Sequence, residues 1–80
     1  MDIRFEKNKA VAYDGTIEIG KCEFLEVENK WNIVHTEVKS DYQGQGIARK
    51  LVECVIEKAK IYNKDLIADC SYAKKVIEGK

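Results

Sequence analysis

The sequence contains no proline, so its turns must be built by glycine, asparagine and aspartate. Cysteine is scarce: Cys22, Cys54 and Cys70 are too few and too scattered for a disulfide framework. With no CxxC spacing and a single histidine, they do not make a zinc site either. No apolar run approaches the roughly 20 residues that cross a bilayer, and the N-terminal segment has no signal-peptide core. We therefore expect a cytoplasmic protein with reduced thiols, no metal and no membrane contact.

Net charge is also absent, because 14 basic and 14 acidic side chains cancel. The distribution is uneven, since residues 1–38 have five basic and eight acidic side chains, whereas residues 39–80 have nine basic and six acidic. This imbalance is too weak to indicate a nucleic-acid partner, although the second half would suit one small anionic ligand. The length and the 45% hydrophobic content indicate one globular domain over residues 1–80.

The first half of the chain has the pattern of β-structure. The pair Asp14-Gly15 is a strong hairpin signal, and the polar "VENK" favours a second turn. In the third apolar segment Ile17 and Ile19 are expected on one face, and Gly20 favours a β-bulge. We expect an antiparallel meander of three or four strands, within residues 3–7, 9–13, 16–24 and 31–38.

The second half changes to a helical period. Apolar residues recur at helical spacing over residues 47–62, opposite a charged face, and Asn63 suits a left-handed position after the helix. Residues 65–69, "DLIAD", predict a short buried strand, and residues 71–79 a final helix capped by Ser71. Strand, helix and strand in this order imply a βαβ unit with parallel strands. The expected fold class is therefore α+β or α/β, a meander followed by a βαβ unit.

Two glycines, Gly44 and Gly46, lie in "KSDYQGQGIARKLVE", between the last strand of the meander and the long helix. Glycine loses much backbone freedom on folding, so this pair indicates a sharp turn or the close approach of another molecule. The first N–H groups of a helix have no backbone partner, and together with the helix dipole they bind phosphate well. The stretch therefore predicts an anion site at the helix N-terminus.

Three families of phosphate-binding loop are candidates for this stretch. A Walker loop needs GxxxxGK followed by Ser or Thr, which is absent. A dinucleotide fingerprint needs GxGxxG, but Arg49 stands at its third glycine position. Only eleven residues follow Asp69, the acid that could bind a ribose, so half of that fold would be missing. Gln43, Gly46 and Ala48 fit the third pattern, Q/R-x-x-G-x-G/A, of the GNAT acetyltransferase superfamily.

Two further blocks extend this resemblance. With "HTEV" before the loop and "CSYA" after the next strand, roughly residues 9–78 resemble the minimal single-domain GNAT-like proteins. The resemblance implies a parallel strand pair that splays apart, with acetyl-CoA in the opening. Its pyrophosphate would meet the loop, and its pantetheine arm would pair with the preceding strand. The cofactor-binding residues that the resemblance implies are Val38, Gln43, Gly44, Gln45, Gly46, Ile47, Ala48, Arg49 and Ser71.

Four side chains are candidates for acetyl transfer to an amine, which needs a group to take the amine proton and one to protonate the leaving thiolate. His35 and Glu37 share a strand face and could form a general-base pair, or simply a polar face. Cys70 precedes the final helix, a position that lowers thiol pKa. It is either an acetyl-accepting nucleophile or a wall of the thioester pocket. Tyr72 could protonate the thiolate, or pack on the cofactor.

The expected function is therefore acetyl-CoA-dependent N-acetyl transfer to a small-molecule or peptide amine. The alternative is a CoA-binding or sensing module with little catalysis. That alternative stays open because the chain lacks the extra helices and strands with which larger members of the superfamily shape the acceptor pocket. The acceptor site would then be very open, or completed by a second subunit, and both a monomer and a homodimer are consistent with the sequence. No nucleic acid is expected as a partner.

Overall fold

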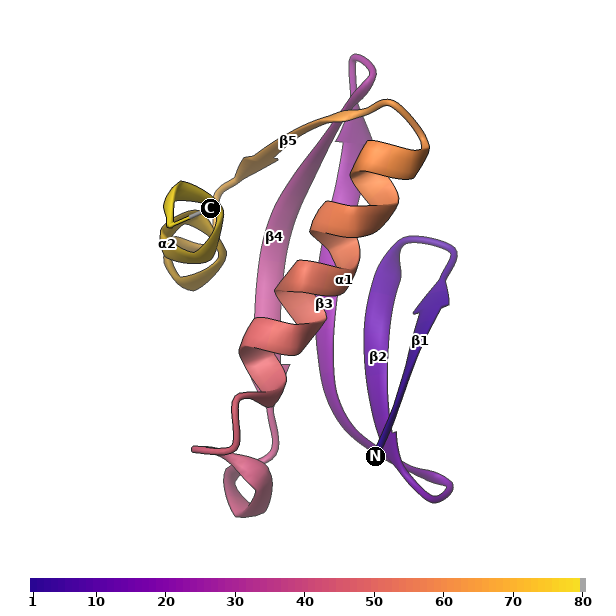
Figure 1. The fold of residues 1–80 in the computed structure, drawn as a ribbon, viewed down its shortest axis with the longest axis vertical. Helices are drawn as coiled ribbons and strands as arrows, with labels where there is room; N and C mark the ends of the chain where they lie inside the picture. Colours follow the sequence, from indigo (N-terminus) through magenta and orange to yellow (C-terminus); the bar gives the residue numbers. More distant parts are fainter. Residues whose placement is uncertain (80) are drawn as a thin grey trace.

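The computed structural model describes residues 1–79, which form a five-stranded sheet and two helices (Figure 1). Lys80, the last residue of the expected domain, lies outside the described residues. The strands lie in the sheet in chain order, so each strand pairs with the one before it. None of the helices in residues 1–79 is long and apolar enough to span a membrane. The elements are β1 (Asp2–Glu6), β2 (Lys9–Asp14), β3 (Ile17–Val27), β4 (Lys30–Val38), the 3₁₀ turn η1 (Ser40–Tyr42), α1 (Ile47–Ile61), β5 (Asp65–Ala68) and α2 (Ser71–Glu78).

The predicted antiparallel meander is formed by β1 to β4, and two-residue turns set its register. The Asp14-Gly15 signal is confirmed, since β2 ends at Asp14 and Gly15 turns the chain with φ of +63°. At the turn between β3 and β4, Glu28 and Asn29 have φ of +52° and +68°. Positive φ at both central residues is what a type I′ hairpin turn requires. The turn expected in "VENK" is therefore confirmed as well.

A bulge in β3 changes which of its side chains face the core. The register with β2 shifts between Ala12 and Tyr13, which leaves Ile19 as the extra residue beside Gly20, where a bulge was expected. Because one extra residue reverses the alternation of side chains, positions on the two sides of the bulge exchange faces. Ile19 is buried but Ile17 is 54% exposed. The expectation that both lie on one face is therefore wrong.

Helix α1 lies across one face of the sheet and provides much of the core (Figure 1). Its buried side chains recur at helical spacing, which confirms the predicted apolar stripe. Tyr62, which follows the helix, is the exception, since it is 56% exposed. Helix α2 adds two buried side chains to the same cluster, Ala73 and Val76. The buried residues of α1 are Ile47, Leu51, Val52, Val55, Ile56 and Ala59.

The end of α1 is fixed by a left-handed residue, as predicted. Asn63 has φ of +60°. Its N–H bonds to the carbonyl of Lys60 at 3.2 Å, and the N–H of Lys64 bonds to the carbonyl of Ala59 at 2.8 Å. These are the two bonds of a Schellman motif, which satisfies carbonyls that the helix end would otherwise leave unpaired.

We expect Asn63→Ala to lower the free energy of unfolding by about 1 kcal/mol, because a left-handed conformation is unfavourable by roughly 1–2 kcal/mol for residues with an ordinary Cβ. For a domain of this size, that loss lowers the melting temperature by roughly 4–8 °C. Asn63→Gly is the matched control, because glycine adopts positive φ readily and should preserve the melting temperature. Equal thermal melts of the alanine variant and the unmodified protein would contradict this role of Asn63.

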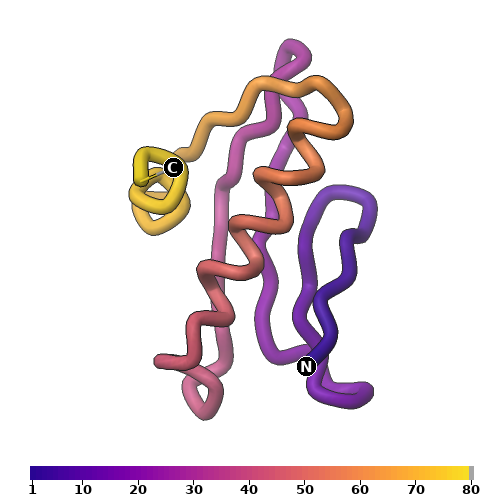
Figure 2. The backbone as a smooth tube through the Cα atoms, viewed as in Figure 1, coloured from indigo at the N-terminus to yellow at the C-terminus, as the bar shows by residue number. Residues whose placement is uncertain are grey.

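Strand β5 leaves β4 after a short parallel pairing. It pairs with residues 30–33 of β4, whereas β4 continues to Val38. Figure 2 shows the trace of residues 65–70 diverging from β4, so the splayed pair is confirmed. β5 is nevertheless an edge strand, and its Ile67 is 46% exposed. The expectation of a buried strand is wrong, because Ile67 alternates with Leu66 and Ala68, which pack against the core, and so faces the opposite side of the sheet.

Candidate functional site

The splayed end of β4, the start of α1 and the start of α2 enclose two adjoining hollows, of about 260 and 500 Å³. Val38, Gln43, Ala48 and Tyr72 line both hollows, which we therefore treat as one groove. These residues come from separate elements that meet only in the fold. The groove lies beyond the carboxyl end of the parallel strand pair, where sheets of this kind usually bind ligands.

The floor of the groove at its smaller hollow is the glycine loop. Gly44 and Gly46 have φ of +81° and +79°, the left-handed region that favours glycine. A Cβ atom at either position would meet no atom within 4 Å, so the space over this backbone is open. The first backbone bond of α1 runs from the Lys50 N–H to the Gly46 carbonyl at 3.1 Å. The N–H groups at the first positions of α1 therefore have no helical partner and are available to an anion.

Side chains hold this loop from two sides. Gln43 Nε2 donates to the carbonyl of Val38 at 3.1 Å, which ties the loop to the end of β4. The Tyr42 hydroxyl donates to Asp14 Oδ2 at 2.6 Å and ties η1 to the turn after β2. Tyr42 and Ile47 also line the smaller hollow. The loop thus keeps its open shape through its own contacts.

Three of the expected cofactor residues lie outside the lining of the groove. Gln45 and Ser71 are exposed and line neither hollow. Arg49 lies along α1, with its Nε 3.4 Å from Glu53 Oε2. A phosphate contact of Arg49 therefore stays a prediction, and it would need the guanidinium to turn away from Glu53.

His35 and Glu37 share a face of β4, as their spacing predicts. Nε2 of His35 lies 2.9 Å from Oε1 of Glu37, and both side chains are about half exposed. Lys21 Nζ on β3 lies 3.8 Å from the same oxygen. Glu37 lines the larger hollow. The pair therefore places a carboxylate, flanked by an imidazole and an ammonium group, beside the groove on the face of β4 opposite Val38.

Cys70, rather than the expected Ser71, is the N-cap residue of α2. Cys70 has extended backbone, with φ of −72° and ψ of 120°, and Ser71 is the first helical residue. The Cys70 N–H bonds to the carbonyl of Ile33 at 3.1 Å, which holds the chain on β4 until the helix begins. The predicted Ser71 cap is therefore wrong by one residue, and no side chain makes a capping bond here.

The three cysteine thiols differ in acidity. Burial raises the pKa of the Cys70 thiol, but hydrogen bonds of the Ala73 backbone, the Thr36 side chain and the Tyr72 backbone together lower it by more. The net pKa lies below the ordinary value of 9.0, the direction expected for a thiol at a helix N-terminus. Burial raises the pKa of Cys22 to about 11, and it also raises that of Cys54. Cys70 is thus the most easily ionised cysteine of the chain.

Sequence reasoning missed Thr36, which lines the larger hollow beside Glu37. A second bulge, in β4, explains its position: Glu23 pairs with His35 and Phe24 with Ile33, so Val34 is the extra residue. The alternation reverses there, and Thr36 faces the core side of the sheet. The block "HTEV" contained this residue, but a threonine in a strand gives no functional signal by itself.

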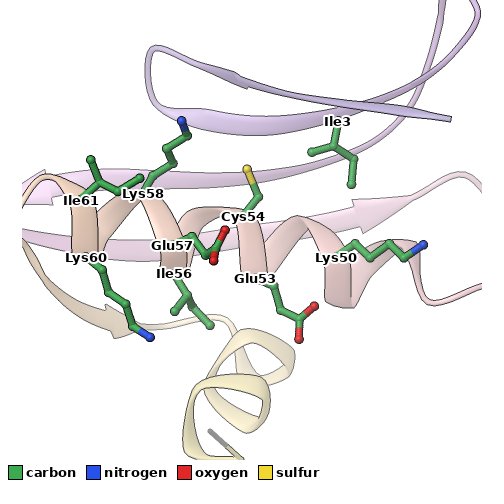
Figure 3. A pocket seen from close by; sticks show the side chains of 9 residues that line it. All are labelled: Ile3, Lys50, Glu53, Cys54, Ile56, Glu57, Lys58, Lys60 and Ile61. Atoms are coloured by element: carbon green, nitrogen blue, oxygen red, sulfur yellow. The ribbon is translucent and has the colours of Figure 1, made fainter.

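A larger hollow of about 630 Å³ lies elsewhere, along the outer side of α1 (Figure 3). Its lining mixes acidic and basic residues of the helix with Cys54 and Ile3. Figure 3 shows these side chains pointing to different sides of the helix rather than toward one ligand. Within residues 1–79, no group of three or more histidine, cysteine or carboxylate side chains could hold a metal ion. The groove is therefore the better candidate for the functional site.

Comparison with known proteins agrees with the resemblance found in the sequence. A family model described as GCN5-related N-acetyl-transferase matches residues 4–80. A solution structure of a GCN5-like protein from Staphylococcus aureus is 34% identical, with a TM-score of 0.75 over 98% of this chain and 78% of that chain. No curated protein sequence matches the chain.

Two larger proteins share the fold over 89% of the chain. One belongs to the NatC complex bound to Gag peptide and CoA, with 30% identity and a TM-score of 0.68. The other is an IAA acetyltransferase from Bacillus cereus, with 27% identity and a TM-score of 0.71. This chain spans 54% and 51% of their lengths. About half of each larger protein therefore has no counterpart here.

Proposed function

The chain belongs to the GCN5-related N-acetyl-transferase family, and on that premise we propose that it moves an acetyl group from acetyl-CoA to an amine in the groove. One observation carries the proposal: open glycine backbone and unpaired helix N–H groups lie together beside a splayed parallel strand pair. The relative in the NatC complex, which is bound to CoA and a peptide, supports a site for both an acyl donor and an amine.

The residues of the groove fit the acyl donor. The open backbone at Gly44 and Gly46 leaves room for a pyrophosphate, whose oxygens would accept hydrogen bonds from the N–H groups that begin α1. Val38 and Tyr72 line both hollows and would flank the pantetheine arm. When bound, acetyl-CoA supplies a thioester whose acetyl group is activated for transfer.

Side chains of β4 and of the segment that begins α2 would carry out the acetyl and proton transfers. Glu37, which lines the larger hollow, would accept the proton of the amine, and His35 at 2.9 Å would hold its carboxylate in place. Cys70, with its lowered pKa, would accept the acetyl group as a thiolate and pass it to the amine, which would return Cys70 to the thiolate. Tyr72 lines both hollows, and its hydroxyl would protonate the leaving thiolate. The amine acceptor, whether small molecule or peptide, would approach through the open side of the groove.

The test is release of free thiol from acetyl-CoA in the presence of a panel of amines that includes peptide N-termini. We expect release above the rate without protein for at least one amine, and a CoA affinity measurable by calorimetry. Binding of CoA without thiol release across the panel would favour the alternative, a CoA-binding or sensing module. Absence of binding in a folded protein would refute both.

A further inference from the structure

The three side chains of Cys22, Thr36 and Cys70 form a chain of hydrogen bonds that no catalytic role discussed so far uses. The Cys70 thiol donates to Thr36 Oγ1 at 3.7 Å, and the Thr36 hydroxyl donates to Cys22 Sγ at 3.6 Å. Cys22 and Thr36 are directly opposite each other on β3 and β4, so the sheet itself fixes this pair. Cys70 reaches them from the start of α2.

We propose that Thr36 is a positioning residue, whose hydroxyl holds the Cys70 sulfur beside the groove and donates a hydrogen bond to it once the thiol has lost its proton. The proposal rests on the proposed function, because it assigns Thr36 a part in the same transfer. Thr36 suits this part by its location, since it contacts Cys70 and also lines the larger hollow. Cys70 itself lines neither hollow, so Thr36 connects the sulfur to the space where a substrate would lie.

The hydrogen bonds among these three side chains would reverse direction when Cys70 ionises, because of what each group can donate. A hydroxyl has a single proton, so Thr36 can donate to only one sulfur at a time. When Cys70 ionises, it can no longer donate and becomes an acceptor. Cys22 is fully buried and keeps its proton at neutral pH, so it can donate to Thr36 Oγ1. The Thr36 proton is then free to turn to Cys70. Of these three side chains, only Cys70 loses a proton in this rearrangement.

Burial is the largest single influence on the Cys70 thiol, and the groups that oppose it are hydrogen-bond partners, Ala73 and Tyr72 on α2 and Thr36 on β4. Among the titratable groups near it, Cys22 is connected through Thr36 and Tyr72 lies on α2, while Asp69 precedes Cys70 and accepts a hydrogen bond from Asn32 Nδ2. His35 and Glu37 have their side chains on the other face of β4, because they alternate with Thr36. The acidity of Cys70 should therefore respond to the loss of the Thr36 hydroxyl more than to the loss of a charge on β4.

The test is the rate at which iodoacetamide alkylates Cys70 as a function of pH, with the modified peptide identified by mass spectrometry. Thr36→Val keeps the branched shape and removes the hydroxyl, so we expect alkylation at neutral pH to fall several-fold and the midpoint of the profile to move upward. Thr36→Ser keeps the hydroxyl and should retain most of the original profile. Thermal melts of both variants establish that they are folded.

An unchanged midpoint in folded Thr36→Val would overturn the proposal, and so would an equal shift in Thr36→Ser. Because alkylation needs neither acetyl-CoA nor an amine, this result is independent of whether the protein transfers acetyl groups. If the profile shifts as expected and thiol release also falls in Thr36→Val, with recovery in Thr36→Ser, the positioning role extends to catalysis. A shifted profile with unchanged release would contradict a role for Thr36 in the transfer.

Discussion

Replacing Gly46 with valine should weaken CoA binding by more than tenfold, about 1.4 kcal/mol. Gly46 has φ of +79° at the N-terminus of α1, and the space over its backbone is open. A valine side chain would fill the space that a pyrophosphate needs in order to reach the N–H groups of the helix. Isothermal titration calorimetry of the two proteins with CoA measures the change directly.

Gly15→Val is the matched control for backbone strain. Gly15 also has positive φ and open space around it, but it lies in the turn between β2 and β3 and lines neither hollow. Both substitutions should lower the melting temperature, because a β-branched residue is strained at positive φ. Only the substitution at Gly46 should weaken binding. Unchanged CoA affinity in folded Gly46→Val would remove the loop from the binding site.

Replacing Cys70 with alanine should abolish turnover and leave CoA affinity largely unchanged. The thiol has a lowered pKa, so a larger share is present as the nucleophilic thiolate at neutral pH than for an ordinary cysteine. The alanine variant keeps the backbone hydrogen bond to Ile33 that holds the start of α2, so the groove should keep its shape. Thiol release measures turnover, and calorimetry measures affinity.

Incubation with acetyl-CoA should add one acetyl group to Cys70 in intact-mass spectra, with peptide mapping to identify the site. Cys54→Ala is the control, because the Cys54 thiol lies on α1 outside the groove and its pKa is raised. That variant should keep both the adduct and the activity. Absence of an adduct on the unmodified protein, together with an active Cys70→Ala variant, would exclude the nucleophile role. Loss of activity in Glu37→Gln would then indicate direct transfer to the amine.

The sequence predicts those features of the fold that short segments determine. The apolar stripe of α1, the Asp14-Gly15 turn and the left-handed Asn63 each follow from local preference. Gly20 also indicated the bulge, but the exchange of faces between Ile17 and Ile19 was missed, because it depends on the register with β2. The exposure of Ile67 was also missed, since an apolar run does not show which of its side chains face the core.

In the candidate site, too, the residues that were predicted are those whose arrangement is local in sequence. The loop around Gly46 and the His35–Glu37 pair are each formed within a few residues, so motif and spacing indicated them. Thr36 was missed because its partners Cys22 and Cys70 are distant in the chain, and only the two strands and α2 together bring them into contact. The catalytic and cofactor roles of all these residues stay predictions.

The strand order of the sheet also has a consequence for the order of folding. Strands β1 to β4 pair with sequence neighbours through short turns, whose closure has a small entropic cost, so residues 2–38 should pair early. The pairing of β5 with β4 must wait until the intervening segment has folded as α1. The bonds of residues 69 and 70 to Ile33 join parts of the chain that are far apart, so they should be among the last to form and the first to open. A ligand in the groove would then bind where the native structure is least stable locally, and part of its binding energy would be used to hold the C-terminal segment closed.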